Sequence, residues 1–93
     1  MTDQRLFSGW VYISRAPDIE GAWIAHCVDF DIMSQGDSPL HALEMVREAL
    51  ELAFADDLNQ GLDPAERGAD VAAEDWVFAT PVTIVMDPNT LPI

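Results

Sequence analysis

The sequence predicts an α+β fold: a small antiparallel sheet with one long helix on one face, in the order β-β-β-α-β. Three strand-like stretches, the first of them rich in aromatic and β-branched residues, precede a single long amphipathic stretch, and a fourth strand-like stretch follows it. None of the first three stretches is followed by the long crossover that parallel pairing needs, so an antiparallel meander is the simplest arrangement. A chain of 93 residues, 49% of them hydrophobic, is expected to form one domain over residues 1–93.

The first two predicted strands, residues 6–15 and 22–28, each have two distinguishable faces. We expect the helix to bury the face that carries Phe7, Val11, Ile13, Trp23, Ala25 and Cys27. The opposite face then carries Trp10, Tyr12, Ile24, His26 and Val28. Pro17 and Gly21 mark the turn between the two strands, and a short third strand follows at residues 32–35.

The helix is predicted over residues 38–60. Ser38 is suited to the N-cap, Pro39 to the first helical position and Gly61 to the residue after the helix. One continuous apolar arc contains Ala42, Leu43, Met45, Val46, Ala49, Leu50, Ala53 and Phe54, and the opposite arc contains His41, Glu44, Arg47, Glu48 and Glu51. Leu52 widens the apolar arc to about 200°, which indicates either a well-buried helix or a helix shared with a second subunit.

The last third of the chain is acidic and then strand-like. Residues 61–75 are rich in Gly, Ala, Asp and Glu, and are expected to form a solvated loop. The final strand is predicted at residues 76–86. Pro81 lies within it and cannot donate to a strand ladder, so this strand should be an edge strand or bulge at Pro81. Residues 87–93 form a short tail.

Composition excludes several classes of protein. The net charge of −13 argues against direct binding of nucleic acid and against an anionic membrane surface. A single cysteine excludes an internal disulfide and a zinc site made of cysteines alone. The polar start of the chain does not resemble a signal peptide, and no apolar run is long enough to cross a membrane. We therefore expect a soluble, cytoplasmic protein.

The candidate metal ligands are His26, Cys27, Asp29 and Asp31, which lie close together in the sequence. A strand sends His26 and Cys27 to opposite faces, so they cannot bind one ion together. The remaining Cys and carboxylate set, without an imidazole, suits no common structural metal. The sequence therefore predicts no metal ligands and no cofactor.

Catalysis is also not expected. His41 with Asp37 could form an acid–base pair, but a histidine in the first turn of a helix is usually a solvated surface residue. Asp29, Asp31 and Asp37 could be read as a metal-binding cluster for phosphodiester hydrolysis, yet turn and cap roles explain them and the net charge would repel that substrate. The chain has no glycine-rich phosphate loop and no nucleophile elbow.

Two segments carry a resemblance to a known family. They are Trp23-Ile24-Ala25 with Asp29-Phe30, and the run Ser34-Gln35-Gly36-Asp37-Ser38, Ala42-Leu43 and Arg47-Glu48-Ala49-Leu50-Glu51-Leu52. In order and spacing over about residues 10–60 they resemble the HicB-like antitoxin family. That family combines an aromatic-x-Ala stretch, a Pro-Asp-Leu-Pro-Gly turn, and Gly-Asp-Thr leading into a helix rich in Glu-Ala-Leu. Asp29-Phe30 matches the Asp-Leu part of that turn, with Val28 before it and Asp31 after it. Many of its members continue into a DNA-binding segment, which we do not expect within residues 87–93, the residues after the last predicted strand.

The resemblance implies a non-catalytic β-β-β-α-β domain, like a degenerate ribonuclease H, that self-associates and masks a small, basic, RNA-cleaving HicA toxin. Two hypotheses follow: a neutralising module for a basic ribonuclease, or a stand-alone homo-oligomeric adaptor without a toxin. The predicted partner-binding residues are Trp10, Tyr12, Ile24, His26, Glu44 and Glu48. An aromatic face left uncovered on an acidic domain suits a basic partner or a homodimer. The alternative is that the acidic loop or the tail folds over that face.

Overall fold

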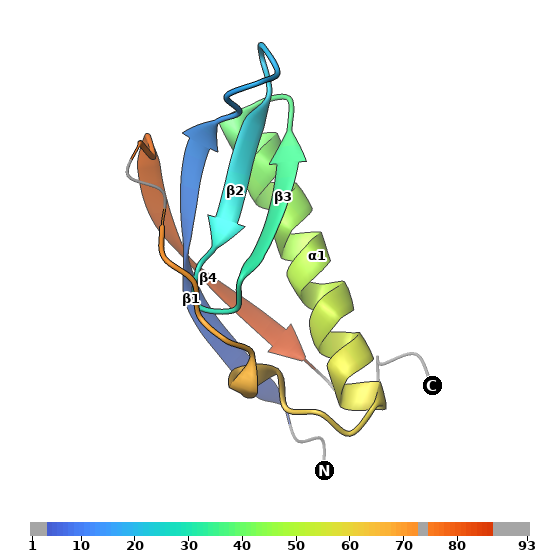
Figure 1. Ribbon diagram of the computed structural model, residues 1–93. Coiled ribbons are helices and arrows are strands. Elements are labelled where there is room, and N and C mark those ends of the chain that lie inside the picture. Colours follow the sequence, from blue (N-terminus) through green and yellow to red (C-terminus); the bar gives the residue numbers. More distant parts are fainter. Residues whose placement is uncertain (1–3, 73–74, 87–93) are drawn as a thin grey trace.

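The computed structural model describes residues 4–72 and 75–86. Its elements are β1 (Arg5–Arg15), β2 (Trp23–Cys27), β3 (Ile32–Gly36), α1 (Pro39–Asn59), the short 3-10 helix η1 (Pro64–Glu66) and β4 (Phe78–Met86). All strand pairs are antiparallel, and the sheet has the order β3-β2-β1-β4 with α1 packed across it (Figure 1). The predicted α+β class and element order are therefore confirmed. The predicted tail, residues 87–93, lies outside the described residues.

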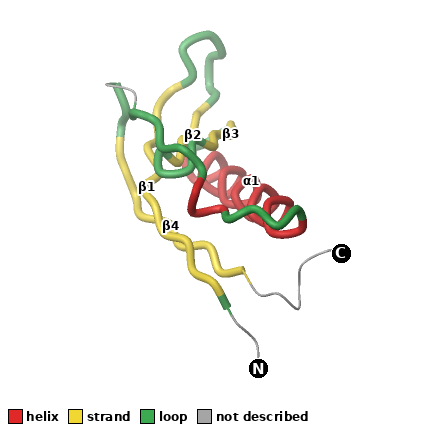
Figure 2. The backbone as a smooth tube through the Cα atoms, turned by 60° about the horizontal axis from the view of Figure 1, so that its bottom comes forward, coloured by secondary structure: helices red, strands yellow, loops and turns green. Residues whose placement is uncertain are grey.

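Strands β1 and β4 form the longest pair in the sheet and run side by side along all of β4 (Figure 2). Their pairing extends without interruption from Arg5 opposite Met86 to Ile13 opposite Phe78. Pro81 lies opposite Trp10 in the middle of this ladder, and β4 pairs with no described strand other than β1. The prediction of an edge strand is thus confirmed, and the alternative of a bulge at Pro81 is wrong.

The core lies between α1 and one face of the sheet. Its fully or nearly fully buried side chains are Phe7, Val11, Ile13, Ala25, Cys27, Phe30, Ala42, Val46, Leu50, Phe54, Val82, Ile84 and Met86. Three phenylalanines from β1, the β2–β3 turn and α1 pack together in it, with ring centroids 4.9 Å apart for Phe7–Phe54 and Phe30–Phe54. The predicted inner face is confirmed, although Trp23 is only partly buried and stacks against Arg15.

Both ends of α1 lie where the sequence predicts them. The Ser38 hydroxyl accepts a hydrogen bond from the His41 backbone N–H at 3.0 Å, Pro39 is the first helical residue, and Gly61 follows the end with φ +78°. Leu52 is 74% exposed, so the wide apolar arc is only partly used by the core. Within the described residues, no helix has the length and apolarity needed to cross a membrane.

Gly36 sets the junction between β3 and α1. A Cβ atom at this position would overlap the backbone of His41 and Ala42 at the start of the helix. The hydrogen atom of glycine therefore lets the first turn of α1 lie directly against the last residue of β3. This contact fixes the angle between β3 and α1.

Candidate functional site on the outer face of the sheet

The sheet face turned away from α1, which we call the outer face, is largely apolar. Its paired side chains include Leu6 with Val85, Trp10 with Pro81 and Tyr12 with Ala79. The large apolar residues of this face that remain exposed are Leu6, Trp10, Met33, Trp76 and Val85. The Ser8 and Thr83 hydroxyls, 3.2 Å apart, lie on this face between the Leu6–Val85 pair and Trp10. Exposed apolar side chains gathered on one face of a folded domain often mark an interface, so this face is the candidate functional site.

The segment between α1 and β4 crosses from the end of the helix along β1 toward the start of β4 (Figure 1). Its first attachment is the carboxylate of Asp63, which accepts a hydrogen bond from Arg5 Nη2 at 2.9 Å. The same carboxylate also caps η1 by accepting from the Ala65 N–H, and these two bonds, the backbone one first, lower the pKa of Asp63. Asp63 therefore ties the loop to the first residue of the sheet.

Two backbone hydrogen bonds hold the later part of the same loop. The Asp70 N–H donates to the Val28 carbonyl and the Val77 N–H donates to the Ile13 carbonyl, both at 2.7 Å. The loop is thus attached beyond the ends of the regular β1–β2 and β1–β4 ladders. Part of the outer face is therefore covered by this loop, which is the alternative that the sequence left open.

Tyr12 and Ile24 lie on the outer face as predicted, but neither is fully exposed. The Tyr12 ring packs edge-to-face against Trp76 at a centroid distance of 5.3 Å. Tyr12 and Ile24 line a cavity of about 240 Å³ together with His26, Met33 and Asp75. Three of the six predicted partner-binding residues therefore border one cavity, and Trp76, which the sequence analysis placed only in the last strand, completes it.

Trp10 is the predicted anchor that stays open, because its side chain is 49% exposed. Its backbone N–H donates to the Asp29 carboxylate at 2.6 Å, and its carbonyl accepts from the Val28 N–H. A Cβ on Gly9 would lie 2.8 Å from Asp29 Oδ2, so glycine makes room for this carboxylate. The Asp29 carboxylate thus bonds the Trp10 backbone N–H at a position of β1 that lies beyond the end of β2.

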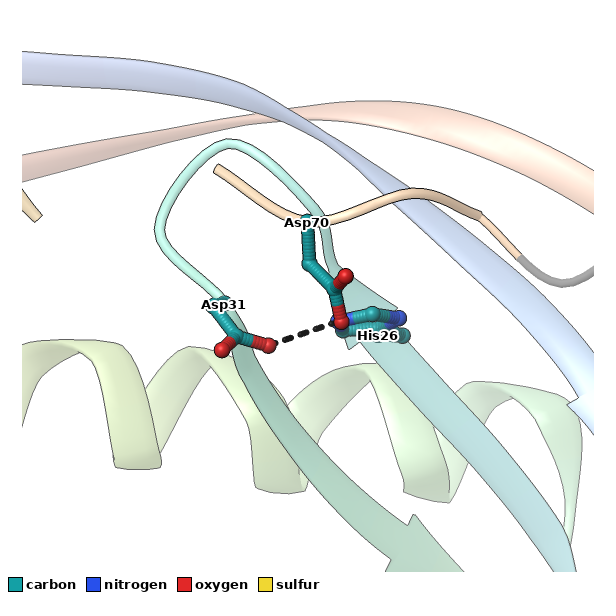
Figure 3. Close-up of side chains that lie close together, drawn as sticks. All are labelled: His26, Asp31 and Asp70. Atoms are coloured by element: carbon teal, nitrogen blue, oxygen red, sulfur yellow. Dashed lines mark hydrogen bonds and ion pairs between the residues drawn. The ribbon is translucent and has the colours of Figure 1, made fainter. Parts of the chain in front are cut away.

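The expectation that His26 is an exposed anchor is wrong. His26 is 8% exposed, and its Nε2 atom lies 3.4 Å from Asp31 Oδ1 and 3.7 Å from Asp70 Oδ2 (Figure 3). Asp31 comes from the β2–β3 turn, where it adopts φ +51°, and Asp70 comes from the loop after α1. The strand parity of His26 was predicted correctly, but the two segments that cover it could not be inferred from parity.

Glu44 and Glu48 do not belong to the same surface as Trp10. Both are exposed on the solvent side of α1, where they line a shallow hollow of about 470 Å³ with His41 and Glu51. Because α1 packs against the inner face of the sheet, the whole core separates these two acids from the outer face. The six predicted residues therefore fall on two opposite sides of the molecule, and a single partner contact on the outer face does not include Glu44 or Glu48.

His41 and Cys27 were the other candidates for catalysis or metal binding, and the contacts of both are structural. His41 Nδ1 accepts a hydrogen bond from the Asp37 backbone N–H at 3.0 Å, next to the helix start. Cys27 is fully buried on the inner face, and burial, with a smaller contribution from the Asp29 charge, raises the pKa of its thiol to about 11. Such a thiol stays protonated at neutral pH and is a poor nucleophile.

Sequence reasoning missed one buried ion pair. Asp57 is 7% exposed on α1, and its two carboxylate oxygens accept from Arg67 Nε at 2.7 Å and from Arg67 Nη2 at 3.1 Å. A signal was present, because a helical projection places Asp57 between Val46 and Leu50, in the middle of the apolar arc. Arg67 is also the only basic residue in the acidic segment, which made it the natural partner.

Comparison of the chain with protein-family models, with curated proteins and with solved structures gives no significant match. The resemblance to the HicB-like family therefore rests on the motifs quoted above.

Proposed function

We propose that this protein is a non-catalytic protein-binding module, similar in role to HicB antitoxins, that takes a basic protein partner on its outer face. The observation that carries the proposal is Trp10, which is 49% exposed on the outer face, opposite Pro81 of β4. Tryptophans in such positions are the commonest energetic anchors of protein interfaces. Tyr12, Ile24 and Trp76 extend the apolar surface next to it.

The charge of the chain supports a basic partner. The net charge is −13, and its only four basic side chains are arginines. Arg5 and Arg67 are held in ion pairs with Asp63 and Asp57, and Arg15 stacks on Trp23. The negative field is therefore weakly compensated, so a partner of opposite charge is attracted and oriented during the encounter.

A homo-oligomeric adaptor is the second candidate. The observation that favours it is the self-complementary character of the outer face, since Leu6 and Val85 are exposed side by side on neighbouring strands. A two-fold symmetric dimer would cover both copies of this patch at once. Because each chain carries −13, such a dimer should strengthen as salt screens the repulsion. A monomer in sedimentation at high protein concentration, in both low and high salt, rules the adaptor out.

The test compares affinity-tagged wild type, Trp10→Ala and Leu40→Ala in the native host, with bound proteins identified by mass. Leu40 is the matched control, because it is a large exposed apolar residue at the start of α1, away from the outer face. We expect a basic protein in stoichiometric complex with wild type and Leu40→Ala. Loss of the Trp10 side chain should weaken that complex by about 2–4 kcal/mol, while the melting temperature stays close to that of wild type.

Three results would contradict the proposal. No stoichiometric basic partner would exclude the basic-protein function, and recovery of a second copy of the chain instead would support the adaptor. Equal binding by Trp10→Ala would remove the outer face as the contact surface. A large fall in melting temperature for Trp10→Ala, with affinity unchanged, would show that Trp10 is a packing residue.

A further inference from the structure

The contacts of His26 with Asp31 and Asp70 are longer than good hydrogen bonds between an imidazole and a carboxylate. Such charge-assisted bonds are usually about 2.7–2.9 Å long. Here the two nitrogen-to-oxygen distances are 3.4 Å and 3.7 Å, although the His26 side chain is only 10% exposed. Both carboxylates nevertheless point toward the same ring nitrogen (Figure 3). A buried polar ring is thus aimed between two anions without a short bond to either.

The same distances match the spacing of ligands around a metal ion. In a tetrahedral site with metal–ligand bonds of about 2.0–2.2 Å, neighbouring ligand atoms lie about 3.3–3.6 Å apart. His26 Nε2 and one oxygen each of Asp31 and Asp70 all lie within 4.8 Å of one another. The Asp31 side chain is 60% exposed, so it has room to rotate slightly toward an ion, whereas Asp70 Oδ2 already faces His26.

Asp70 is also oriented for such a role. Its Oδ1 atom accepts a hydrogen bond from the Val71 N–H at 2.8 Å, which leaves Oδ2 directed at His26. Its backbone N–H is fixed to the Val28 carbonyl at 2.7 Å. Hydrogen bonds that hold a ligand in one orientation are a regular part of metal sites and raise their affinity.

We propose that His26, Asp31 and Asp70 form a binding site for a divalent transition-metal ion, Zn²⁺ in the first instance. Zinc accepts imidazole nitrogen and carboxylate oxygen in one tetrahedral shell, whereas Mg²⁺ and Ca²⁺ prefer shells made only of oxygen. Three protein ligands leave one position for water or for a ligand from a partner. This departs from the sequence-based expectation of no metal, because Asp70 is distant in the chain and Cys27, on the opposite face, plays no part.

The ion would join three segments, namely β2, the β2–β3 turn and the loop that follows α1. It would therefore fix the acidic loop on the outer face beside the cavity that Tyr12 and Ile24 line. The site is independent of the identity of any protein partner, so its presence or absence is decided without one.

The test measures Zn²⁺ binding to the purified full chain by equilibrium dialysis, with Mg²⁺ as the comparison ion. Wild type should bind one Zn²⁺ per chain, and Asp70→Asn should bind it at least about tenfold more weakly, since even the loss of an outer partner weakens metal sites by about 10–100-fold. Asp37→Asn is the matched control, because Asp37 is an exposed acid beside the other histidine, His41. It should leave the affinity unchanged.

A second readout separates this site from general binding to an acidic surface. The chain has two histidines, so its imidazole NMR signals provide an internal comparison. One equivalent of Zn²⁺ should shift the His26 signals and leave those of His41 in place. Absence of saturable one-to-one binding, equal affinity for Asp70→Asn, or equal shifts of both histidines would overturn the proposal.

Discussion

Replacing Asp57 by Asn tests whether the buried pair with Arg67 holds the loop to the helix. The substitution keeps the shape of the side chain and removes its charge. In the structure the Asp57 side chain is 10% exposed and the Arg67 side chain 33% exposed, and two nitrogen–oxygen contacts of 2.7 Å and 3.1 Å join them. Paired, bidentate contacts of this kind are the stronger class of ion pair.

The size of the effect follows from this partial burial. Breaking a fully buried pair costs about 3–5 kcal/mol, because the remaining charge is left without a partner. Arg67 is one-third exposed and regains water when Asp57 is neutralised, so we expect a loss of about 1–3 kcal/mol. For a domain of this length that corresponds to roughly 4–8 °C of melting temperature for each kcal/mol.

The assay is urea unfolding of Asp57→Asn, Arg67→Met and the double variant. Asp56→Asn is the matched control, because the adjacent Asp56 is exposed and its carboxylate accepts a hydrogen bond from Gln60. We expect the control to stay within about 0.5 kcal/mol of wild type. The two single changes should be non-additive, since each removes the same interaction. Equal losses for Asp56→Asn and Asp57→Asn, or additive single effects, would refute the reasoning.

Three further predictions concern the core and its neighbours. Leu50→Ala should lower the free energy of unfolding by about 2–5 kcal/mol, because Leu50 is fully buried, and an unchanged melting temperature would contradict the core assignment. Gly36→Ala should cost about 1–3 kcal/mol through overlap with the helix start, whereas Gly68→Ala, with open space around it, should be neutral in the same melts. The pKa of the Cys27 thiol is about 11 in the folded protein, against an ordinary value of 9.0 that applies to the unfolded chain. Because the unfolded chain loses this proton first, the free energy of unfolding should fall as pH rises from 9 to 11. Urea unfolding from pH 8 to 11 should show this fall in wild type and a smaller one in Cys27→Ala.

The parts of the fold that the sequence predicted are those set by short-range patterns. Ser38, Pro39 and Gly61 mark the helix ends through hydrogen bonds and φ angles that involve only nearby residues. Pro81 marks β4 as an edge strand because its missing N–H is a property of the residue itself. Alternation along β1 likewise separated the buried Val11 from the half-exposed Trp10.

The site was predicted less completely because its coverage depends on contacts between distant segments. Strand parity places His26 on the outer face, but only the folded chain brings Asp70 to it. Glu44 and Glu48 were correctly expected to be exposed, yet their acidity said nothing about which side of the sheet they occupy. Charge and exposure are local properties, whereas membership of one surface is decided by the tertiary structure.

The position of β4 has a consequence for the order of folding. Among the described elements this strand comes last, yet it pairs with β1, which comes first. Residues 5–10 of β1 have no ladder partner in β2 and depend on β4 for theirs, with Arg5 opposite Met86. Such a non-local pairing raises the contact order and slows folding relative to local pairings. During synthesis the β1–β2–β3–α1 part has all its mutual contacts available before β4 emerges, and until then the first half of β1 is an unpaired edge open to other chains.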